Sequence, residues 1–369
     1  MRKKYTVLIL LALILLSCTI PAGIDMFSSV PATQVAQLAS DVGPLLVQAP
    51  LDATPTATPF LPMPPTPTYI PTDFPTPQPT VVPTAATSSG VKKTWADYPG
   101  PSVWPDIAIP APIGILNQPS DQVNIMILGS DQRPHDYGFR TDTILLVTIS
   151  PSLGTVNITS FPRDLYVYIP GWTIQRINTA FAHGDYDLLA KTMEYNFGVH
   201  PDYYVLANFW TFSQAIDNLG GIDVNVARVF TDARTGRGDF TVYPGINHMN
   251  GDEALWYVRA RYTSSDFDRG RRQQEVLQAI FNRVMSINGI AKAPQLYQTY
   301  KSSVTSNISL DLIKTLLPLA PKLKDASMIH HFYIGPGQVY SWVNTSGADV
   351  LVPNRDAVIE VMRQALNSK

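Results

Sequence analysis

The sequence predicts an α/β or α+β sandwich built around a central sheet. Between Val123 and Phe161, short apolar runs bounded by glycine or turn residues indicate strands. Further along the chain, segments with helical periodicity are interleaved with strand-like runs, which is the pattern of a sheet covered by helices. The sequence shows no internal repeat, so we expect one layered domain rather than a repeat array.

Three consecutive strands form the first part of this domain. The apolar runs that predict them are Val123–Gly129, Thr143–Ile149 and Thr155–Phe161. A loop joins the first two runs and a tight turn joins the last two, and such short connections favour antiparallel neighbours over crossovers. We therefore expect the end of the first strand, the start of the second and the end of the third to share one edge.

Helices and strands then alternate. We expect a helix around Asp185–Phe197, a strand around Tyr203–Phe209, a helix at Thr211–Leu219, a strand at Gly221–Val226 and an amphipathic helix at Asp268–Ile287. The helix that ends at Leu219 is followed by two glycines, which is a C-cap signal.

The N-terminus has the layout of an export signal. Cationic residues at Met1–Lys4 precede an apolar run from Tyr5 to Leu16, which is well short of the ~20 residues that a membrane-spanning helix needs. The run ends at Cys18, the only cysteine, and resembles a lipobox, although Leu16 is larger than usual at its position. We expect residues 1–18 to be a lipoprotein-type signal peptide with Cys18 lipidated, which would hold the protein at the extracytoplasmic face of the cell membrane. The alternative is a cysteine buried in an uncleaved N-terminal transmembrane anchor.

A stalk is predicted between this anchor and the domain. Proline and threonine dominate residues 50–83, and such a composition favours extended polyproline conformations and cannot build a packed core. We therefore assign residues 19–105 to a disordered Pro/Thr-rich stalk and residues 106–369 to the folded domain.

Bulk composition excludes several classes of function. The formal net charge is −2 and the sequence pI is about 6.3, and no helix-turn-helix pattern is present, so a nucleic-acid partner is not expected. The histidines lack paired metal spacing and the only cysteine lies in the export signal, which argues against zinc. Neither a phosphate-binding Walker loop nor a nucleophile-elbow serine is evident.

Acidic and basic side chains gather at the shared edge of the first three strands. Asp131 follows the first strand, Asp142 precedes the second and Arg163 follows the third, while Arg133 and Arg140 lie in the loop between the two aspartates. Two carboxylates with few other hard ligands suit Mg²⁺, which takes one or two carboxylates together with substrate phosphates. A structural network of salt bridges at a sheet edge explains the same residues equally well.

A second basic cluster precedes and begins the amphipathic helix. Arg259 and Arg261 come first, and on the helix itself Arg269 and Gln273 fall on the apolar stripe, with Arg272 at its border. Arg271 points away and is spaced to pair with Glu275. Cations in partly buried space need a counter-anion, and the guanidinium group matches phosphate oxygens bidentately, so we expect Arg269 and Arg272 to bind a phosphate or pyrophosphate.

The segments that carry these residues resemble the LytR-CpsA-Psr family, also described as the cell envelope-related transcriptional attenuator family. The matching segments are Asn124–Arg133, Phe139–Leu145, Ser160–Val167, Ile177–Ala180, Gly220–Val224 and Ala254–Ile280. They follow one another in the family's order within core motifs at residues 123–287. The resemblance implies a three-layer α-β-α sandwich with a central mixed, largely antiparallel sheet and a hydrophobic tunnel for a polyprenyl chain.

The resemblance also implies an activity and a set of site residues. The activity is a Mg²⁺-assisted phosphotransfer that moves a glycan phosphate from a polyprenyl pyrophosphate carrier to peptidoglycan or another envelope acceptor. By residue-level match, the metal positions are Asp131 and Asp142, Arg163 joins them as a catalytic residue, and the pyrophosphate-binding set is Arg133, Arg140, Arg259, Arg261, Arg269, Arg272 and Gln273.

Two alternatives remain open at this point: a polyprenyl pyrophosphate hydrolase, and a non-catalytic envelope regulator or transcriptional attenuator. The N-terminus departs from the family, whose members usually carry a transmembrane helix in place of a lipobox and stalk.

Overall fold

The computed structural model describes residues 90–133, 139–234, 236–286, 297 and 304–368. The predicted signal peptide, Cys18 and the stalk up to residue 89 lie outside these ranges. Within them, none of the helices combines the length and the apolar character that crossing a membrane requires.

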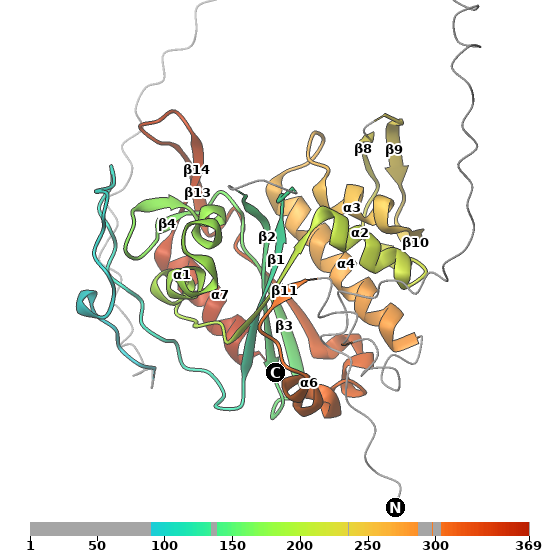
Figure 1. Ribbon diagram of the computed structural model, residues 1–369, viewed down its shortest axis with the longest axis horizontal. Coiled ribbons are helices and arrows are strands. Elements are labelled where there is room, and N and C mark those ends of the chain that lie inside the picture. The colour runs from blue at the N-terminus through green and yellow to red at the C-terminus, as the bar shows by residue number, and fades with distance from the viewer. Residues whose placement is uncertain (1–89, 134–138, 235, 287–296, 298–303, 369) are drawn as a thin grey trace, which may run out of the picture. The chain divides into compact units, whose positions relative to one another are not determined.

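A six-stranded mixed sheet forms the centre of the domain (Figure 1). Its strands are β1 (Val123–Ser130), β2 (Thr141–Ser150), β3 (Thr155–Ser160), β6 (Tyr203–Asn208), β11 (Thr305–Ser306) and β12 (Ile329–Tyr333), in the order β11-β6-β1-β2-β3-β12. β1, β2 and β3 are antiparallel neighbours, as their short connections predicted, and β11 is antiparallel to β6. The pairs β1–β6 and β3–β12 are parallel.

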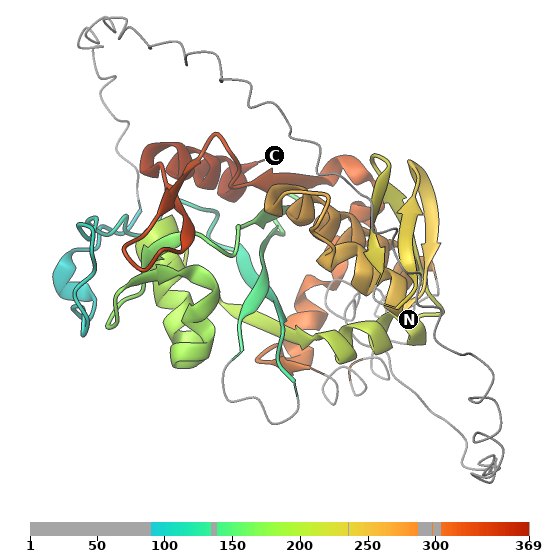
Figure 2. The ribbon, with the colours of Figure 1, turned by 90° about the horizontal axis from the view of Figure 1, so that it is seen from above.

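Helices cover both faces of this sheet, which confirms the α-β-α sandwich. One face carries α1 (Ala180–Phe197) and α7 (Arg355–Asn367), and the other carries α2 (Phe209–Asn218), α3 (Gly251–Arg259), α4 (Asp266–Ser286) and α6 (Leu310–Leu316). Figures 1 and 2 show the sheet between these two groups of helices. Single turns of 3₁₀ helix lie at Trp95–Asp97, Ile177–Thr179, Leu317–Leu319, Lys322–Lys324 and Ala326–Met328.

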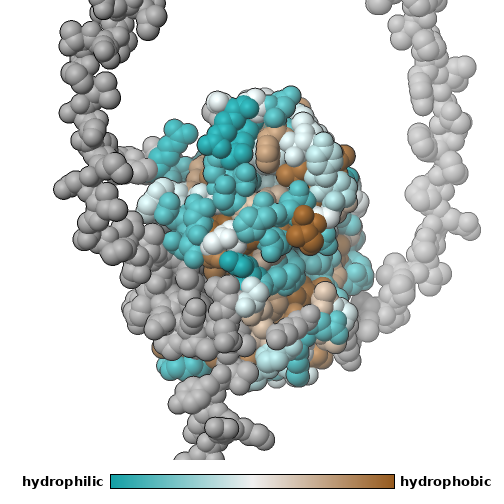
Figure 3. Space-filling view, turned by 90° about the vertical axis from the view of Figure 1, so that its right-hand side faces the viewer, coloured by the Kyte–Doolittle hydropathy of each residue, from teal (hydrophilic) through white to brown (hydrophobic). Residues whose placement is uncertain are grey.

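The strands are buried on both faces, and alternate residues enter two separate cores. Ile125 of β1 and Val147 of β2 belong to the core under α2, α3 and α4, whereas Met126 and Leu146 belong to the core under α1 and α7. This explains why the sequence shows continuous apolar runs rather than a strict alternation of apolar and polar residues. From the side of α2, α4 and β10 (Gly245–Met249), the described surface is mostly hydrophilic with small apolar patches (Figure 3).

Four two-stranded sheets accompany the central one in the described ranges. They are β4 (Tyr166–Tyr168) with β5 (Ile174–Arg176), β7 (Ile222–Val226) with β10, β8 (Phe230–Arg234) with β9 (Gly238–Val242), and β13 (Val339–Val343) with β14 (Asp349–Pro353). The strand predicted at Gly221–Val226 is therefore present as β7, but its partner is β10 and it lies outside the central sheet.

Helix boundaries differ from the prediction by a few residues. α1 begins at Ala180 because a first helical turn precedes a kink at Gly184 and Asp185, where Asp185 has a φ of 55°. The Asn208 side chain accepts a hydrogen bond from the Thr211 amide at 2.9 Å and caps α2, which begins at Phe209, two residues earlier than predicted. Gly220 and Gly221 both have positive φ values, as a glycine C-cap requires.

The folded unit includes residues that the composition assigned to the stalk. Tyr98 is buried, and its hydroxyl donates to Glu194 of α1 at 2.8 Å. The ring of Trp95 packs edge-on against Tyr195 with centroids 5.8 Å apart. The predicted boundary at residues 105–106 therefore falls within this packed segment, because these aromatic side chains bury apolar area despite the surrounding prolines.

Candidate functional site

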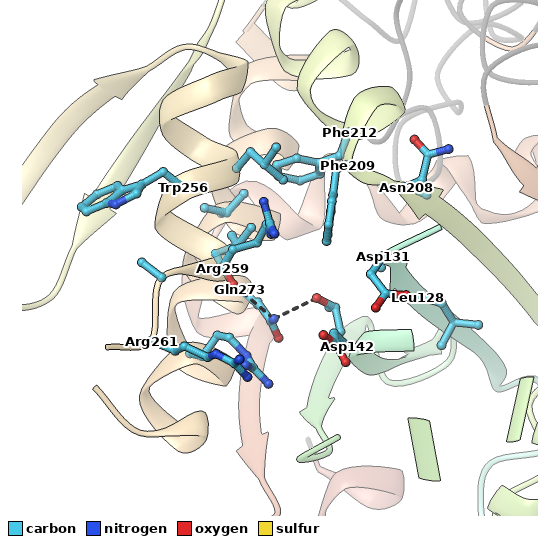
Figure 4. Close-up of a pocket in the computed structure, with 18 of the residues that line it drawn as sticks. Leu128, Asp131, Asp142, Asn208, Phe209, Phe212, Trp256, Arg259, Arg261 and Gln273 are labelled. Carbon is cyan, nitrogen blue, oxygen red and sulfur yellow. Dashed lines mark hydrogen bonds between the residues drawn. The ribbon is translucent and has the colours of Figure 1, made fainter. Parts of the chain in front are cut away.

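A cavity of about 780 Å³ lies between the sheet and helices α2, α3 and α4 (Figure 4). Its two ends differ in chemistry. The apolar end is lined by side chains from the middle of the sheet and from the helices, namely Ile127, Leu145, Val205, Phe212, Val276, Leu277 and Ile280. The charged end is lined by Asp131, Asp142, Asp252, Arg133, Arg140, Arg163, Arg234, Arg237, Arg259, Arg261 and Arg269.

Helix α4 and strand β1 explain why the ends differ. Arg269 and Gln273 lie near the start of α4. Ile280 lies about 10 Å beyond Gln273 along the helix axis, at 1.5 Å per residue. Strand β1 runs from the apolar Ile127 to Asp131, which directly follows the strand. The cavity therefore suits a ligand with an anionic head and an apolar chain.

The two predicted aspartates emerge at one sheet edge, as the strand connections predicted. The β1–β2 ladder pairs Ser130 with Thr141, so Asp131 and Asp142 lie beside that pair. Asp131 accepts hydrogen bonds from the backbone of Arg140 at 2.6 Å and from its guanidinium at 3.1 Å. Asp142 accepts from the Arg163 guanidinium at 2.9 Å and from the Asn178 amide at 3.2 Å. Both aspartates line the cavity and also take part in salt bridges.

Arg163 is held by three carboxylates. Its guanidinium lies 2.9 Å from Asp142, 3.2 Å from Asp164 and 3.4 Å from Asp266. Burial opposes the charge on this group, but the three carboxylates outweigh that cost and raise the pKa of Arg163. Arg163 is therefore a fixed cation at the end of β3.

Arg259 and Arg261 face the two aspartates across the cavity (Figure 4). The Arg259 guanidinium stacks on the Phe209 ring, 3.8 Å from its centroid. Burial lowers the pKa of Arg259, and the charges of Asp142, Arg133 and Asp131 also act on it, so these groups converge. Within the residues that the structure describes, neither Arg259 nor Arg261 forms an ion pair. Their charges therefore face the cavity without a direct ion-pair partner in the described part of the chain.

Arg269 and Gln273 occupy the positions that helical phase predicted. Arg269 is buried, pairs with Asp266 at 3.0 Å and has its pKa lowered by burial. Gln273 donates to the Thr143 hydroxyl at 2.8 Å, which links α4 to β2 (Figure 4). A Cβ atom at Gly270 would lie 2.6 Å from the Ser160 hydroxyl. The glycine therefore allows α4 to approach the end of β3 and places Arg269 beside the cavity.

Arg272 does not line the cavity, in contrast to its predicted role in pyrophosphate binding. Its side chain is fully buried and pairs with Asp268 at 3.1 Å. Its remaining donors reach the carbonyl oxygens of Tyr257 and Ala260 and the hydroxyl of Ser264. The counter-anion that the sequence led us to expect is thus Asp268, one turn earlier on the same helix.

Arg271 is oriented as predicted but is less exposed. It pairs with Glu275, the partner that its spacing predicted, and also with Asp268 at 2.8 Å. Its side chain is only 20% exposed, so it lies in a packed ion-pair cluster rather than on an open surface.

Sequence reasoning missed the contribution of the β8–β9 hairpin. Arg234 at the end of β8 and Arg237 in the turn line the cavity together with Asp252 of α3. Phe230, Asp232 and Arg234 form the buried face of β8. The signal that could have revealed this contribution was the presence of an arginine on that buried face.

The acidic pair fits a magnesium ion in its chemistry. Within the described ranges, no group of three or more histidine, cysteine, aspartate or glutamate side chains could hold a metal by itself. Mg²⁺ commonly takes only one or two carboxylates and completes its shell with phosphate oxygens and water. Asp131 and Asp142 supply two carboxylates at the end of the cavity where the arginines could hold a phosphate.

Comparison with known proteins places this geometry in a family. The model of the LytR_cpsA_psr family matches residues 102–365. The polyisoprenyl-teichoic acid–peptidoglycan teichoic acid transferase TagU of Oceanobacillus iheyensis is 35% identical over 213 residues, covering 56% of this chain and 65% of the relative. TagT of Bacillus subtilis, with the same description, is 33% identical over 216 residues, covering 57% and 67%. The chain thus spans just under two thirds of the length of TagU.

Solved structures share the fold. The crystal structure of B. subtilis TagV superposes on this chain with a TM-score of 0.57 at 26% identity, covering 67% of this chain and 96% of TagV. TagT bound to LIIa-WTA gives a TM-score of 0.54 at 28% identity, covering 67% and 90%. TagT with bound octaprenyl pyrophosphate lipid gives 0.50 at 27% identity, covering 69% and 92%. Because the family model covers most of the chain, the chain belongs to the LytR-CpsA-Psr family, and four of its six matching segments contribute residues to the lining of this cavity.

Proposed function

We propose that this chain is an extracytoplasmic phosphotransferase that moves a glycan phosphate from a polyprenyl pyrophosphate carrier to a hydroxyl of peptidoglycan or another envelope acceptor. The observation that carries the proposal is the two-ended cavity, in which eight arginines and three aspartates meet a continuous apolar lining. A polyprenyl pyrophosphate has the complementary form, because its head is anionic and its chain is apolar.

The relatives support this assignment. A solved structure of TagT has bound octaprenyl pyrophosphate lipid, a ligand of this chemistry. TagU and TagT are described as transferases of teichoic acid from a polyisoprenyl carrier to peptidoglycan.

The proposed reaction is a single displacement at phosphorus. The acceptor hydroxyl oxygen forms a bond to the phosphorus atom that carries the glycan, and the bond from that phosphorus to the bridging oxygen breaks. Polyprenyl phosphate leaves with the bridging oxygen and its electron pair. The hydroxyl proton passes to a carboxylate at the reacting end, Asp131 or Asp142.

Catalysis would rest on positioning and charge rather than on a protein nucleophile. Arg163 is held by its carboxylates, and Arg259 and Arg269 enter the same end from α3 and α4, so charge that develops on phosphate oxygens meets fixed cations. Asp131 and Asp142 are the residues that would hold Mg²⁺, which supplies further positive charge to those oxygens when bound.

Asp142→Asn in the full-length protein tests the proposal. Transfer of labelled glycan to cell-wall fragments should fall at least about 100-fold, which corresponds to about 2.7 kcal/mol of transition-state stabilisation. Stability should change little, because Arg163 keeps Asp164 and Asp266 as partners. Asp164→Asn is the matched control, since Asp164 also pairs with Arg163 but does not line the cavity.

An unfolded Asp142→Asn variant, or one that retains near-normal specific transfer, would contradict the catalytic assignment. The same assay separates transfer from hydrolysis. Attack by water would release free glycan phosphate without attaching it to the wall fragments, which would make the protein a polyprenyl pyrophosphate hydrolase.

The membrane location is a separate part of the proposal. Cys18 ends a short apolar export signal and has no cysteine with which to pair, so we propose that it is acylated and anchors the mature protein. Cys18→Ser should release the protein from the membrane fraction and change its electrophoretic mobility. Unchanged fractionation and mobility would indicate an uncleaved anchor.

A further inference from the structure

We propose that the mouth of the cavity contains a pyranose-binding subsite built from Tyr262, Arg234, Arg237 and Asp252. The subsite lies beyond the residues that serve the pyrophosphate and would bind a sugar ring next to the reacting phosphate. It rests on the proposed function, because that function places a sugar on either side of the phosphate that is transferred.

Tyr262 and the β8–β9 hairpin form one rigid frame. The buried carboxylate of Asp232 accepts hydrogen bonds from the backbone amides of Tyr262 at 2.8 Å and Thr263 at 3.4 Å. The Thr263 hydroxyl donates to the carbonyl oxygen of Thr231 in β8. The loop that carries Tyr262 is thereby fixed to the strand that ends in Arg234.

The aromatic ring of Tyr262 is exposed to solvent beside the β8–β9 hairpin. It is 86% exposed although its backbone is held, and it lines the cavity. Arg261, its neighbour in sequence, lines the same cavity and belongs to the set expected to bind pyrophosphate. A sugar bonded to that phosphate therefore lies within reach of the ring, and the apolar C–H face of a pyranose matches an aromatic face.

The hairpin supplies the polar side of the subsite. The Arg234 side chain is only 9% exposed, donates to Asp252 and lies 3.7 Å from Glu253. Its Nε atom is buried and has no hydrogen-bond partner within the described structure. Arg237 lies 3.6 Å from the same oxygen of Asp252, whose side chain is 61% exposed. The cluster thus presents both donors and an accessible acceptor.

Charge favours a sugar over a second phosphate at this position. Arg234 and Arg237 are balanced by Asp252 and Glu253, whereas the pyrophosphate end has an excess of arginines. A phosphate beside Asp252 would be repelled. Each pyranose hydroxyl can donate to a carboxylate and accept from a guanidinium, which matches the mixed pair.

Two probes test the subsite in the full-length protein in detergent: octaprenyl pyrophosphate, and the same lipid carrying one N-acetylhexosamine. Wild type should bind the sugar-bearing probe about tenfold more tightly than the bare lipid, a difference within the range of one aromatic contact and two hydrogen bonds. Tyr262→Ala should remove this gain and leave binding of the bare lipid unchanged, whereas Tyr262→Phe should retain it because stacking needs no hydroxyl.

A second experiment tests whether the sugar bound at Tyr262 is that of the acceptor rather than that of the donor. The protein is first saturated with octaprenyl pyrophosphate, and binding of a cell-wall disaccharide is then measured. A loss of disaccharide affinity in Tyr262→Ala, with unchanged donor binding, would assign the subsite to the acceptor sugar. Tyr340→Ala is the matched control, because Tyr340 is also exposed but lies on β13 outside the cavity lining.

The possible failures are distinguishable. If Tyr262→Ala changes the result of neither experiment while wild type binds octaprenyl pyrophosphate, the subsite is wrong and the proposed function stands. If wild type does not bind octaprenyl pyrophosphate, the proposed function itself fails.

Discussion

The two faces of the central sheet are built from the same strands but differ in packing. Under α1 and α7, buried side chains such as Met126, Leu146 and Met193 form a close-packed core. Under α2, α3 and α4, the neighbouring strand positions Ile127 and Leu145 instead line a cavity of about 780 Å³. Protein interiors rarely leave a void of this size, so the difference marks the second face as the functional one.

The arginines around the second face show the same contrast on a smaller scale. Arg272 is buried, and each of its three guanidinium nitrogens donates to a protein oxygen. Arg259 and Arg261 line the cavity and have no ion-pair partner within the described ranges. Burial of an arginine therefore does not identify a ligand site; the donors that remain available to the cavity do.

Removing Arg272 should have the largest effect on stability. Arg272→Ala leaves the carbonyl oxygens of Tyr257 and Ala260 without this donor and empties packed volume, which should lower the free energy of unfolding by about 3–5 kcal/mol. Arg261→Ala should change it by less than about 0.5 kcal/mol, because that side chain forms no ion pair with any residue that the structure describes. Denaturant unfolding of both full-length variants measures the contrast, and equal losses would show that Arg261 also supports the fold.

Replacing Arg269 or Arg271 should separate a cavity arginine from a structural arginine by their effects on glycan transfer. Arg269→Ala should reduce glycan transfer at least about 100-fold, because a cation is lost from the reacting end of the cavity. Arg271→Ala should retain transfer within a few-fold, since Arg271 forms ion pairs with Asp268 and Glu275 and does not line the cavity. A steady-state transfer assay at matched protein stability decides this, and similar losses in both variants would mean that Arg271 also reaches the substrate.

Truncating one leucine on each face should give the smallest contrast. Leu146→Ala should cost about 2–5 kcal/mol, because Leu146 is fully buried in the filled core. Leu277→Ala should cost roughly 1 kcal/mol, since that side chain already borders open volume and makes fewer contacts. Thermal unfolding measures both, and a larger loss at Leu277 would indicate that the cavity is closed in solution.

Local sequence signals predicted much of the site. Connection lengths made the first three strands antiparallel, and that alone brought Asp131, Asp142 and Arg163 to one edge. Helical phase separated Arg269 from Arg271. The same reasoning did not anticipate the partners of Arg272, because a helical wheel shows which face a residue occupies but not which backbone carbonyls approach that face.

The sequence by itself determined the first three strands and the main helices up to α4, the edge where the acidic pair lies and the motifs that identify the family, because each depends on periodicity, on short connections or on residue identity. Only the tertiary structure decided that β7 pairs with β10 outside the central sheet and that Arg234 and Asp252 join the cavity. It also decided that Tyr98 packs on α1, far along the chain. These contacts join residues distant in sequence, and their formation depends on how whole layers pack rather than on any local pattern.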